Sequence, residues 1–270
     1  MTDHYAVTGN PIAHSRSPTI HTLFAAQTGQ DLRYDALLAP FDGFATTVRD
    51  FAATGGRGMN VTVPFKEEAY RLATVLTPRA QAAGAVNTLS FEGADIRGDN
   101  TDGAGLVRDL VHNLGCPVEG RRVLLLGAGG AARGVIQPLL EHRPARLLIA
   151  NRTAHKAAAL AGVFPGTTAC DLPALQESEM AFDIVINATS SGLSDEALPL
   201  SAGIFAAGAL AYEMVYGKAT PFLRLAAAAE VRGVDGLGML VEQAAEAFFV
   251  WRGVRPDTGP VLRQLRPGSA

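Results

Sequence analysis

The stretch RRVLLLGAGGAARGVIQPLLEH, residues 121–142, is the strongest indication of the fold in the sequence. It begins with a short apolar run at residues 122–126, which is typical of a strand buried on both faces. A glycine-rich turn, GAGGAA, follows directly, and a helical run comes after the turn. A strand, a glycine-rich turn and a helix in this order begin a βαβ unit, so the stretch predicts α/β architecture with a parallel sheet.

The turn itself fits the dinucleotide fingerprint G-x-G-x-x-G/A. Its first glycine permits a tight turn, its second lets the backbone approach a pyrophosphate, and the final Ala132 lets the helix pack close to the strand. We therefore predict a Rossmann-type, doubly wound domain whose cofactor contacts come from Gly127, Ala128, Gly129, Gly130 and Ala131. A glycine-rich turn without a ligand is the alternative interpretation.

The end of the next predicted strand, ARLLIANRT, indicates which dinucleotide binds. An NAD site usually carries Asp or Glu there, which binds the ribose 2′-hydroxyl. This chain instead has Asn151, Arg152 and Thr153, with Lys156 one helical turn later. Because a guanidinium pairs well with phosphate, the corner favours NADP(H). Thr153 is expected to cap the following helix, and the alternative is that Arg152 and Lys156 are solvated surface charges.

The rest of the chain alternates predicted strands and helices. In the first hundred residues, YAVTG, RYDALLA, GMNVTVP and AVNTLSF are typical of strands, and residues 42–54 and 66–72 are typical of helices. A polar, glycine-rich stretch, RGDNTDGAGL, then marks a domain boundary and leads into a helix that ends near Leu114. A long helix at about residues 240–252 is the last strong element, before a proline-rich tail, and it can pack on either domain.

The stretch GNPIAHSRSPTIH, residues 9–21, predicts a helix start. Ser17 is a suitable N-cap, Pro18 suits the first helical position, and Gly29 ends the helix. A helix N-terminus with the free hydroxyls of Ser15 and Ser17 beside it favours anions, carboxylates included. A simple cap, with Ser15 in a polar loop, is the alternative.

A second set of polar residues follows predicted strands. Asn60, Thr62 and Lys66 stand where a strand meets a helix, Asn87 follows a similar apolar run, and Asp102 lies in the glycine-rich boundary. Open α/β sheets bind ligands outside the carboxyl ends of their strands, and Asn60 and Thr62 alternate along one strand face. Neutral amides and hydroxyls suit a polyol-like substrate, and Lys66 held by Asp102 is a candidate proton donor. A surface lysine and a turn-forming aspartate are the alternatives.

The composition sets the broad class. The chain has 270 residues, 48% of them hydrophobic and 18% charged, and a net charge of −3. The length is enough for one large or two ordinary domains, the composition allows substantial apolar cores, and the lack of a basic stripe argues against nucleic acid. Cys116 and Cys170 stand alone in the sequence, so no metal site is expected. The first residues resemble no signal peptide and no run is long enough to cross a membrane, so we expect a cytoplasmic protein. A monomer and a homodimer are both left open.

Taken together, these segments resemble the shikimate dehydrogenase family over nearly the whole chain. They occur in family order and at family spacing: GNPIAHSRSPTIH, GMNVTVPFKEEA, GAVNTL, GDNTDG, GAGGAAR, NRT, NATSSGL, MVYGKATPF and DGLGMLVEQAAEAF. The resemblance implies an α/β enzyme with two domains that reduces 3-dehydroshikimate to shikimate reversibly with NADPH. It implies a mixed-sheet substrate-binding domain at residues 1–103 plus 237–270, and an NADP-binding domain at residues 104–236.

The resemblance also implies roles for individual residues. Ser15 and Ser17 would bind the substrate carboxylate, and Lys66 and Asp102 would form the catalytic pair. The ring hydroxyls and keto group would be held by Asn60, Thr62, Asn87 and Gln243, with Tyr216 reaching the substrate from the nucleotide domain. Met214, Gly236 and Met239 would line the nicotinamide pocket, and Thr189 would lie along the cofactor.

Some points of the resemblance stay open. Glu213 stands where many relatives have Asp, a conservative change from which a small effect is expected. A quinate dehydrogenase using NAD and an aminoshikimate-type dehydrogenase are the related alternatives. A nucleotide-binding regulator without activity is the alternative from another class, and the presence of both Lys66 and Asp102 argues against it.

Overall fold

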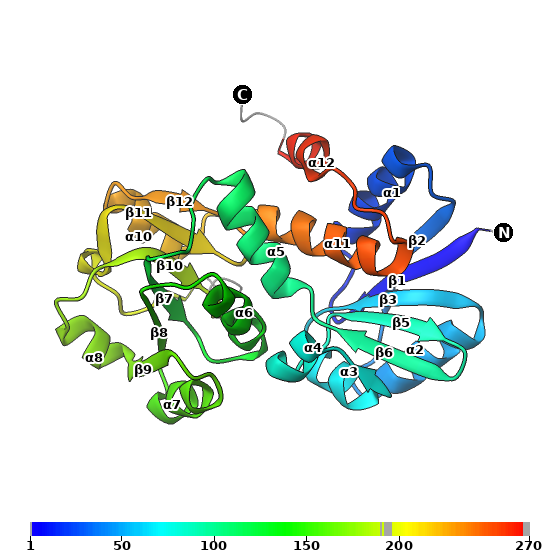
Figure 1. Ribbon diagram of the computed structural model, residues 1–270, viewed down its shortest axis with the longest axis horizontal. Coiled ribbons are helices and arrows are strands. Elements are labelled where there is room, and N and C mark those ends of the chain that lie inside the picture. The colour runs from blue at the N-terminus through cyan, green and yellow to red at the C-terminus, as the bar shows by residue number, and fades with distance from the viewer. Residues whose placement is uncertain (1, 190, 192–195, 267–270) are drawn as a thin grey trace. The chain divides into compact units, whose positions relative to one another are not determined.

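The chain divides into two units, each built around its own sheet. The computed structural model describes residues 2–189, 191 and 196–266. The first unit comprises Met1–Gly105 and Leu240–Ala270, and the second comprises Leu106–Met239 (Figure 1). These bounds lie two residues after the expected boundary at residue 103 and three residues after the expected one at residue 236.

The first unit has a mixed sheet of six described strands in the order β2-β1-β3-β5-β6-β4. Strand β1 pairs in parallel with β2 and β3, whereas β5 is antiparallel to both β3 and β6. A mixed sheet was predicted for this part of the chain, and the prediction is confirmed. The strands are β1 (Asp3–Gly9), β2 (Leu32–Leu38), β3 (Gly56–Val61), β4 (Val75–Leu76), β5 (Thr88–Glu92) and β6 (Asp95–Asp99).

Helices cover both faces of this sheet because β1 buries alternate side chains in opposite directions. Tyr5 and Val7 pack in a cluster with Tyr34 and Trp251, whereas Ala6 packs with the helix and strand residues around Phe44. Figure 1 accordingly shows α1 and α11 on one side and α2 and α3 on the other. The helices of this unit are α1 (Ser17–Thr28), α2 (Phe44–Ala53), α3 (Lys66–Leu72), α4 (Pro78–Ala83) and α12 (Thr258–Leu265). It also contains the first part of α5 (Asp102–Arg108) and most of α11 (Leu237–Arg252).

Helix α12 corrects one expectation. The segment after residue 252 was interpreted as a proline-rich tail, but Thr258–Leu265 is helical, and Asp257 caps it by accepting the Gly259 N–H. So short a helix is barely stable by itself and forms because it packs against α1. Arg16, at the start of α1, adds to this contact by donating to the Leu265 carbonyl at 3.1 Å.

The second unit has a parallel sheet of six described strands in the order β12-β11-β10-β7-β8-β9. Numbered within the unit, this is the strand order 6-5-4-1-2-3 of a doubly wound dinucleotide-binding sheet, as predicted. The strands are β7 (Arg122–Leu126), β8 (Arg146–Asn151), β9 (Thr167–Asp171), β10 (Phe182–Asn187), β11 (Phe205–Glu213) and β12 (Arg232–Val234). The α-helices are α6 (Gly130–Glu141), α7 (Ala154–Val163), α8 (Leu172–Glu177) and α10 (Pro221–Ala228).

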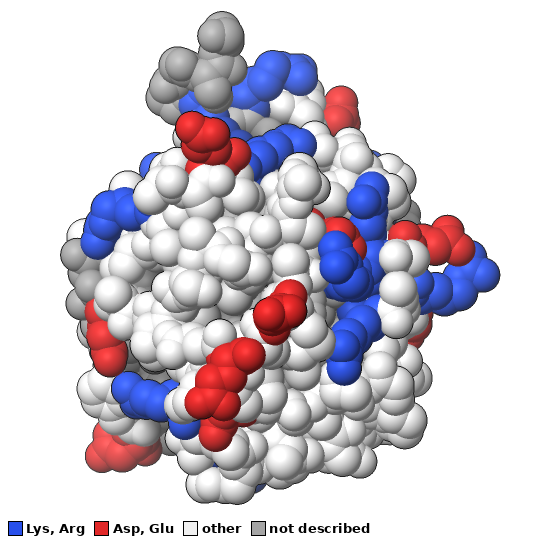
Figure 2. Space-filling view, turned by 90° about the vertical axis from the view of Figure 1, so that its left-hand side faces the viewer, with Lys and Arg blue, Asp and Glu red and all other residues white. Residues whose placement is uncertain are grey.

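Two further features complete the described fold. Helix α5 continues as a π-helical turn, Asp109–Asn113, so the helical stretch predicted to end near Leu114 does so. On the face shown in Figure 2, Lys and Arg side chains are interspersed with Asp and Glu among uncharged residues, as expected from a chain with mixed charge.

Candidate active site and cofactor-binding site

One edge of the first sheet gathers most of the polar residues singled out in the sequence. Strands β1, β3 and β6 all end there, and β5 begins there because it runs antiparallel. The loops that follow β1 and β3 are joined, since the Asn10 N–H donates to the Val63 carbonyl at 3.0 Å. The sheet topology therefore brings together segments that are far apart along the chain.

Lys66 and Asp102 form an ion pair at this edge. The Lys66 Nζ lies 2.5 Å from the Asp102 Oδ2, and the two side chains are 22% and 8% exposed. Lys66 is the first residue of α3 and Asp102 the first residue of α5. A carboxylate at a helix N-terminus is stabilised by the helix dipole, and this one also neutralises the lysine charge.

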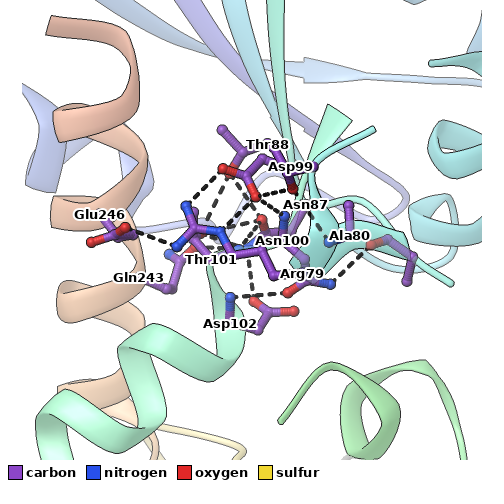
Figure 3. A network of polar contacts seen from close by, with 12 residues as sticks. Arg79, Ala80, Asn87, Thr88, Asp99, Asn100, Thr101, Asp102, Gln243 and Glu246 are labelled. Carbon is purple, nitrogen blue, oxygen red and sulfur yellow. Dashed lines mark hydrogen bonds and ion pairs between the residues drawn. The ribbon is translucent and has the colours of Figure 1, made fainter. Parts of the chain in front are cut away.

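Asn87 lies at the centre of a polar network beside this pair (Figure 3). Its Nδ2 lies 2.8 Å from the Asp102 Oδ1 and 3.2 Å from the Gln243 Oε1, and its Oδ1 accepts the Thr101 N–H at 2.8 Å. Because Asn87 is almost fully buried, these bonds hold its amide in one orientation. The network joins three of the predicted site residues: Asn87, Asp102 and Gln243.

Asn60 makes three hydrogen bonds within the protein. Its Nδ2 donates to the Asn87 carbonyl and to the Thr88 hydroxyl, both at 3.1 Å, and its Oδ1 accepts the Tyr34 hydroxyl at 2.7 Å. Both amide hydrogens thus have partners within the protein. In this arrangement the Asn60 amide fixes the position of the Asn87 backbone carbonyl.

Thr62 corrects the argument from strand alternation. Strand β3 ends at Val61, so Thr62 lies beyond the strand, where the chain turns toward α3. The turn is closed by the Phe65 N–H, which donates to the Thr62 carbonyl at 3.0 Å. Thr62 is nevertheless at the same sheet edge, because its own N–H donates to the Thr8 carbonyl at 2.9 Å.

The two serines also differ from expectation in detail. Helix α1 begins at Ser17, so its N-cap position is Arg16, and Pro18 is the second helical residue instead of the first. The Ser15 Oγ accepts the Ser17 N–H at 3.3 Å. Ser17 was expected to cap the helix, but in the described structure no side chain caps α1 in the usual way. The two serines are adjacent at the helix start, as an anion site would require.

The glycine-rich turn in the second unit fits a pyrophosphate. Gly127 has φ +109°, a conformation that favours glycine, and a Cβ there would lie 3.1 Å from the Ala188 carbonyl oxygen. A Cβ on Gly129 or Gly130 would meet no atom of the described residues within 4 Å. Among the described side chains none caps α6, so its first-turn N–H groups remain available to a phosphate.

The corner after β8 carries the residues expected to choose the dinucleotide. Asn151 ends the strand, and its Nδ2 donates to the Thr153 carbonyl at 3.1 Å. Arg152 is 81% exposed and its Nη1 lies 3.4 Å from the exposed Glu196 carboxylate, while Lys156 is exposed on α7. Thr153 precedes α7 in an extended conformation, but its side chain makes no capping hydrogen bond; that expectation was wrong.

The loops after β10 and β11 bring together most of the residues expected near the nicotinamide. The Thr189 hydroxyl donates to the Asn187 Oδ1 at 2.7 Å, and the Met214 N–H donates to the Asn187 carbonyl at 3.0 Å. The Gly236 N–H donates to the Val215 carbonyl, and a Cβ on Gly236 would overlap the Met214 carbonyl. Tyr216 lies in the same β11–α10 loop and is partly exposed.

Met239 belongs to the second unit as well. Its N–H donates to the hydroxyl of the buried Tyr212 at 3.2 Å, and that hydroxyl donates to the Asp109 Oδ2 at 2.6 Å. The start of α11 is thereby tied to β11, the strand that precedes the Met214 loop.

Glu213 has more partners than the sequence suggested. It is completely buried, and its Oε2 accepts hydrogen bonds from Asn187 and Thr220, each at 2.8 Å, while its Oε1 accepts the Val215 N–H at 3.1 Å. Burial raises the pKa of this carboxyl, and the three donors work in the opposite direction. The sequence does indicate a buried carboxylate here, because Glu213 is an acidic residue within the apolar strand segment ALAYEM.

Other charged residues near Asp102 were missed altogether. Arg79, Asp99 and Glu246 form hydrogen-bonded ion pairs, and Thr101 joins the Asn87 network. No spacing rule in the sequence links these positions, because they lie on α4, β6 and α11.

Among the residues that the structure describes, no helix is both long enough and apolar enough to cross a membrane. No group of three or more His, Cys, Asp or Glu side chains in the described ranges is arranged to hold a metal ion.

Three family models match consecutive parts of the chain. Residues 7–89 match the shikimate dehydrogenase substrate binding domain, and residues 109–194 match shikimate / quinate 5-dehydrogenase. Residues 236–266 match the shikimate 5′-dehydrogenase C-terminal domain.

Similar proteins cover the whole length. The shikimate dehydrogenase (NADP(+)) of Dechloromonas aromatica (strain RCB) is 62% identical over 98% of both chains. The crystal structure of an Ael1 enzyme from Pseudomonas putida is 50% identical over 98% of both chains, with a TM-score of 0.93. Shikimate 5-dehydrogenase from Thermus thermophilus, solved with NADP(H) and shikimate, is 34% identical over 98% of this chain and 100% of the other, with a TM-score of 0.87. The chain belongs to the shikimate dehydrogenase family.

Proposed function

We propose that this protein is an oxidoreductase that reduces 3-dehydroshikimate to shikimate with NADPH and catalyses the reverse reaction with NADP⁺. The observation that carries the proposal is the Lys66–Asp102 ion pair, which lies beside Asn87 and Gln243 at the ligand-binding edge of a mixed sheet. A charged lysine next to neutral amides suits a substrate that is a polyhydroxylated ketone.

The chemical step needs a hydride and a proton. Bound NADPH supplies the hydride, which adds to the carbonyl carbon as the carbonyl π-bond breaks. The Lys66 ammonium gives its proton to the carbonyl oxygen, so the ketone becomes a secondary alcohol. Asp102 holds the Lys66 Nζ at 2.5 Å and thereby fixes the direction of proton transfer. The low exposure of both side chains limits competition from water.

The remaining residues of the first unit bind and orient the substrate. Ser15 and Ser17, at the start of the 12-residue helix α1, would bind the carboxylate, because the hydroxyls and the helix N-terminus both favour an anion. Asn87, Gln243 and Thr62 would bind the ring oxygens. Asn60 would act through Asn87, to which its amide is already hydrogen-bonded.

The second unit would bind the cofactor. The first-turn N–H groups of α6 and the open space at Gly129 and Gly130 suit the pyrophosphate. Arg152 and Lys156 suit the 2′-phosphate, because both are exposed and basic and neither Asp nor Glu stands at the end of β8. Thr189, Met214, Gly236, Met239 and Tyr216 would complete the nicotinamide side.

The test is nicotinamide absorbance with the purified full chain, given shikimate or quinate in combination with NADP⁺ or NAD⁺. We expect the nicotinamide to be reduced only in the combination of shikimate with NADP⁺. Reduction of NAD⁺ by quinate would agree with the proposed roles of Lys66 and Asp102. It would contradict the assignments of shikimate as substrate and of NADP(H) as cofactor. Tight NADPH binding without turnover on any of these substrates would favour a nucleotide-binding regulator.

The proposal also includes a cytoplasmic location and a monomeric or homodimeric state. Sedimentation of the full chain at several concentrations distinguishes monomer from dimer.

A further inference from the structure

Arg79, on α4, joins two carboxylates from distant parts of the first unit (Figure 3). Its Nε and Nη2 donate to the Asp99 Oδ1 and Oδ2 at 2.6 and 2.7 Å, and its Nη1 donates to the Glu246 Oε1 at 2.8 Å. Asp99 ends β6, whereas Glu246 lies on α11. A guanidinium can make these three bonds at once because its donors form a rigid planar fork.

The first carboxylate leads directly to Asp102. The Asp99 Oδ1 accepts the Asn100 N–H at 2.7 Å, and the Asn100 Oδ1 accepts the Asp102 N–H at 3.1 Å. The Asn100 Nδ2 also donates to the Ala85 carbonyl at 3.0 Å. The backbone of Asp102 is therefore connected to Arg79 by consecutive hydrogen bonds.

The second carboxylate leads to Gln243. Glu246 follows Gln243 by three residues on α11, so both lie on one face of the helix. The other Glu246 oxygen accepts a hydrogen bond from Arg255, which completes its pairing. Helix α5 approaches this face closely, since a Cβ on Gly105 would lie only 2.6 Å from the Gln243 backbone nitrogen.

We propose that Arg79 is a positioning residue: by binding Asp99 and Glu246 together, it sets where Gln243 lies relative to Asp102 and so orients the Lys66 proton donor and the substrate. The inference rests on the proposed dehydrogenase activity. Arg79 itself would touch neither substrate nor cofactor. Arg79 would act through Asp99, three residues before Asp102, and through Glu246, three residues after Gln243.

The charges of this network agree with such a role. Burial alone would raise the pKa of Asp99, but the Arg79 guanidinium, with the Thr77 hydroxyl, outweighs burial and lowers it. Burial would also raise the pKa of Glu246, but the hydrogen bonds from Arg255 and Arg79 outweigh burial and lower this pKa. Both carboxylates therefore remain charged. Loss of Arg79 would leave the buried Asp99 carboxylate poorly paired next to the site, whereas Glu246 would keep its bond with Arg255.

The experiment compares Arg79→Lys with a matched control, Arg122→Lys. Arg122 makes a similar two-bond contact with Asp183, but it lies at the start of β7 in the second unit. For Arg79→Lys we expect kcat/KM for shikimate to fall by about 10²-fold, as small displacements of reacting groups commonly produce. KM for shikimate should rise and kcat should fall, while KM for NADP⁺ stays unchanged. Arg122→Lys should retain all kinetic constants.

Two outcomes would overturn the inference. One is wild-type kinetics in Arg79→Lys; the other is an equal kinetic loss in Arg122→Lys, which would indicate general destabilisation. If Arg79→Lys fails to fold, Glu246→Gln serves instead, since it preserves the Arg79–Asp99 contact. That variant should raise KM for shikimate more than it lowers kcat, and unchanged KM contradicts the proposal. Wild-type turnover is measured first: an inactive wild type contradicts the proposed function, whereas an active wild type with unaffected variants contradicts only the role of Arg79.

Discussion

The Lys66 Nζ lies 2.5 Å from the Asp102 Oδ2, although 36 residues separate them in the chain. The other carboxylate oxygen of Asp102 accepts a hydrogen bond from Asn87, so the aspartate is itself held in place. A flexible lysine side chain is thus directed by a fixed partner. A proton donor needs such an arrangement when it must approach the acceptor oxygen of the substrate from one direction.

Replacing the lysine tests this directly. Lys66→Met removes the ammonium while keeping most of the side-chain length. We expect kcat to fall by about 10²–10⁴-fold, the usual contribution of general acid–base catalysis, with little change in either KM. Glu67→Gln, at the neighbouring exposed position, is the control and should retain kcat. Near-normal turnover of Lys66→Met in a steady-state assay would mean that another group transfers the proton.

Arg152 should determine the preference for NADP⁺. Arg152→Ala removes a charged group suited to the 2′-phosphate, and hydrogen bonds to charged groups contribute about 1.5–3 kcal/mol. KM for NADP⁺ should therefore rise by about 10–100-fold, while KM for NAD⁺ stays the same. Arg121→Ala, at an exposed position of the same unit, is the control. Equal effects on both cofactors would show that Arg152 does not read the 2′-phosphate.

Glu213 should support the cofactor loops. Glu213→Gln keeps the shape of the side chain but leaves one acceptor oxygen for Asn187, Thr220 and the Val215 N–H. A buried donor without a partner costs about 1–3 kcal/mol, so the midpoint of thermal unfolding should fall. KM for NADP⁺ should rise as the Met214 loop shifts.

The length of this side chain matters as well. Glu213→Asp withdraws the carboxylate by one methylene and should lower the unfolding midpoint too, in contrast to the small effect expected from the sequence. Glu177→Gln, exposed at the end of α8, is the control for charge. An unchanged unfolding midpoint in both Glu213 variants would show that the hydrogen bonds to Glu213 contribute no net stability.

His21 should make stability depend on pH. Its ring is completely buried and stacks on Tyr34 with centroids 4.1 Å apart, and burial lowers the pKa of His21 to about 3, with the Asn60 side chain acting in the opposite direction. The unfolded chain binds this proton near pH 6.5 and the folded chain does not. The folded state therefore loses about 1.4 kcal/mol per pH unit as the pH falls from 6.5 toward 3.

The measurement is the unfolding free energy of wild type and His21→Leu between pH 7 and pH 4.5. Subtracting one curve from the other removes shared contributions, such as that of Glu213. The wild type should lose stability more steeply on acidification than the variant. Parallel curves would show that His21 is protonated in the folded state.

The dinucleotide-binding fold followed from local sequence. Residues 122–126, predicted as a strand, form β7 with the same bounds, because an apolar run followed by GAGGAA has few other stable conformations. The order of the six strands in that sheet then follows the usual topology of such domains. Helix α12 escaped prediction because its stability comes from packing against α1, and the sequence around it contains Pro256 and Pro260.

The site, like the fold, has features that local sequence predicts and features that depend on packing. The residue types of the site can be recognised in the sequence: a lysine, an aspartate, paired serines, a phosphate-binding turn and an arginine where an NAD site has an acid. The three-dimensional fold adds that Asn60 binds Asn87, that Glu213 receives three hydrogen bonds and that Arg79 joins Asp99 to Glu246. The physical reason is that a motif is a property of neighbours along the chain, whereas buried polar partners are chosen by the pairing of strands and the packing of helices. Asp99 and Glu246 meet the same guanidinium because β6 and α11 both pass beside α4, and no spacing in the sequence records that.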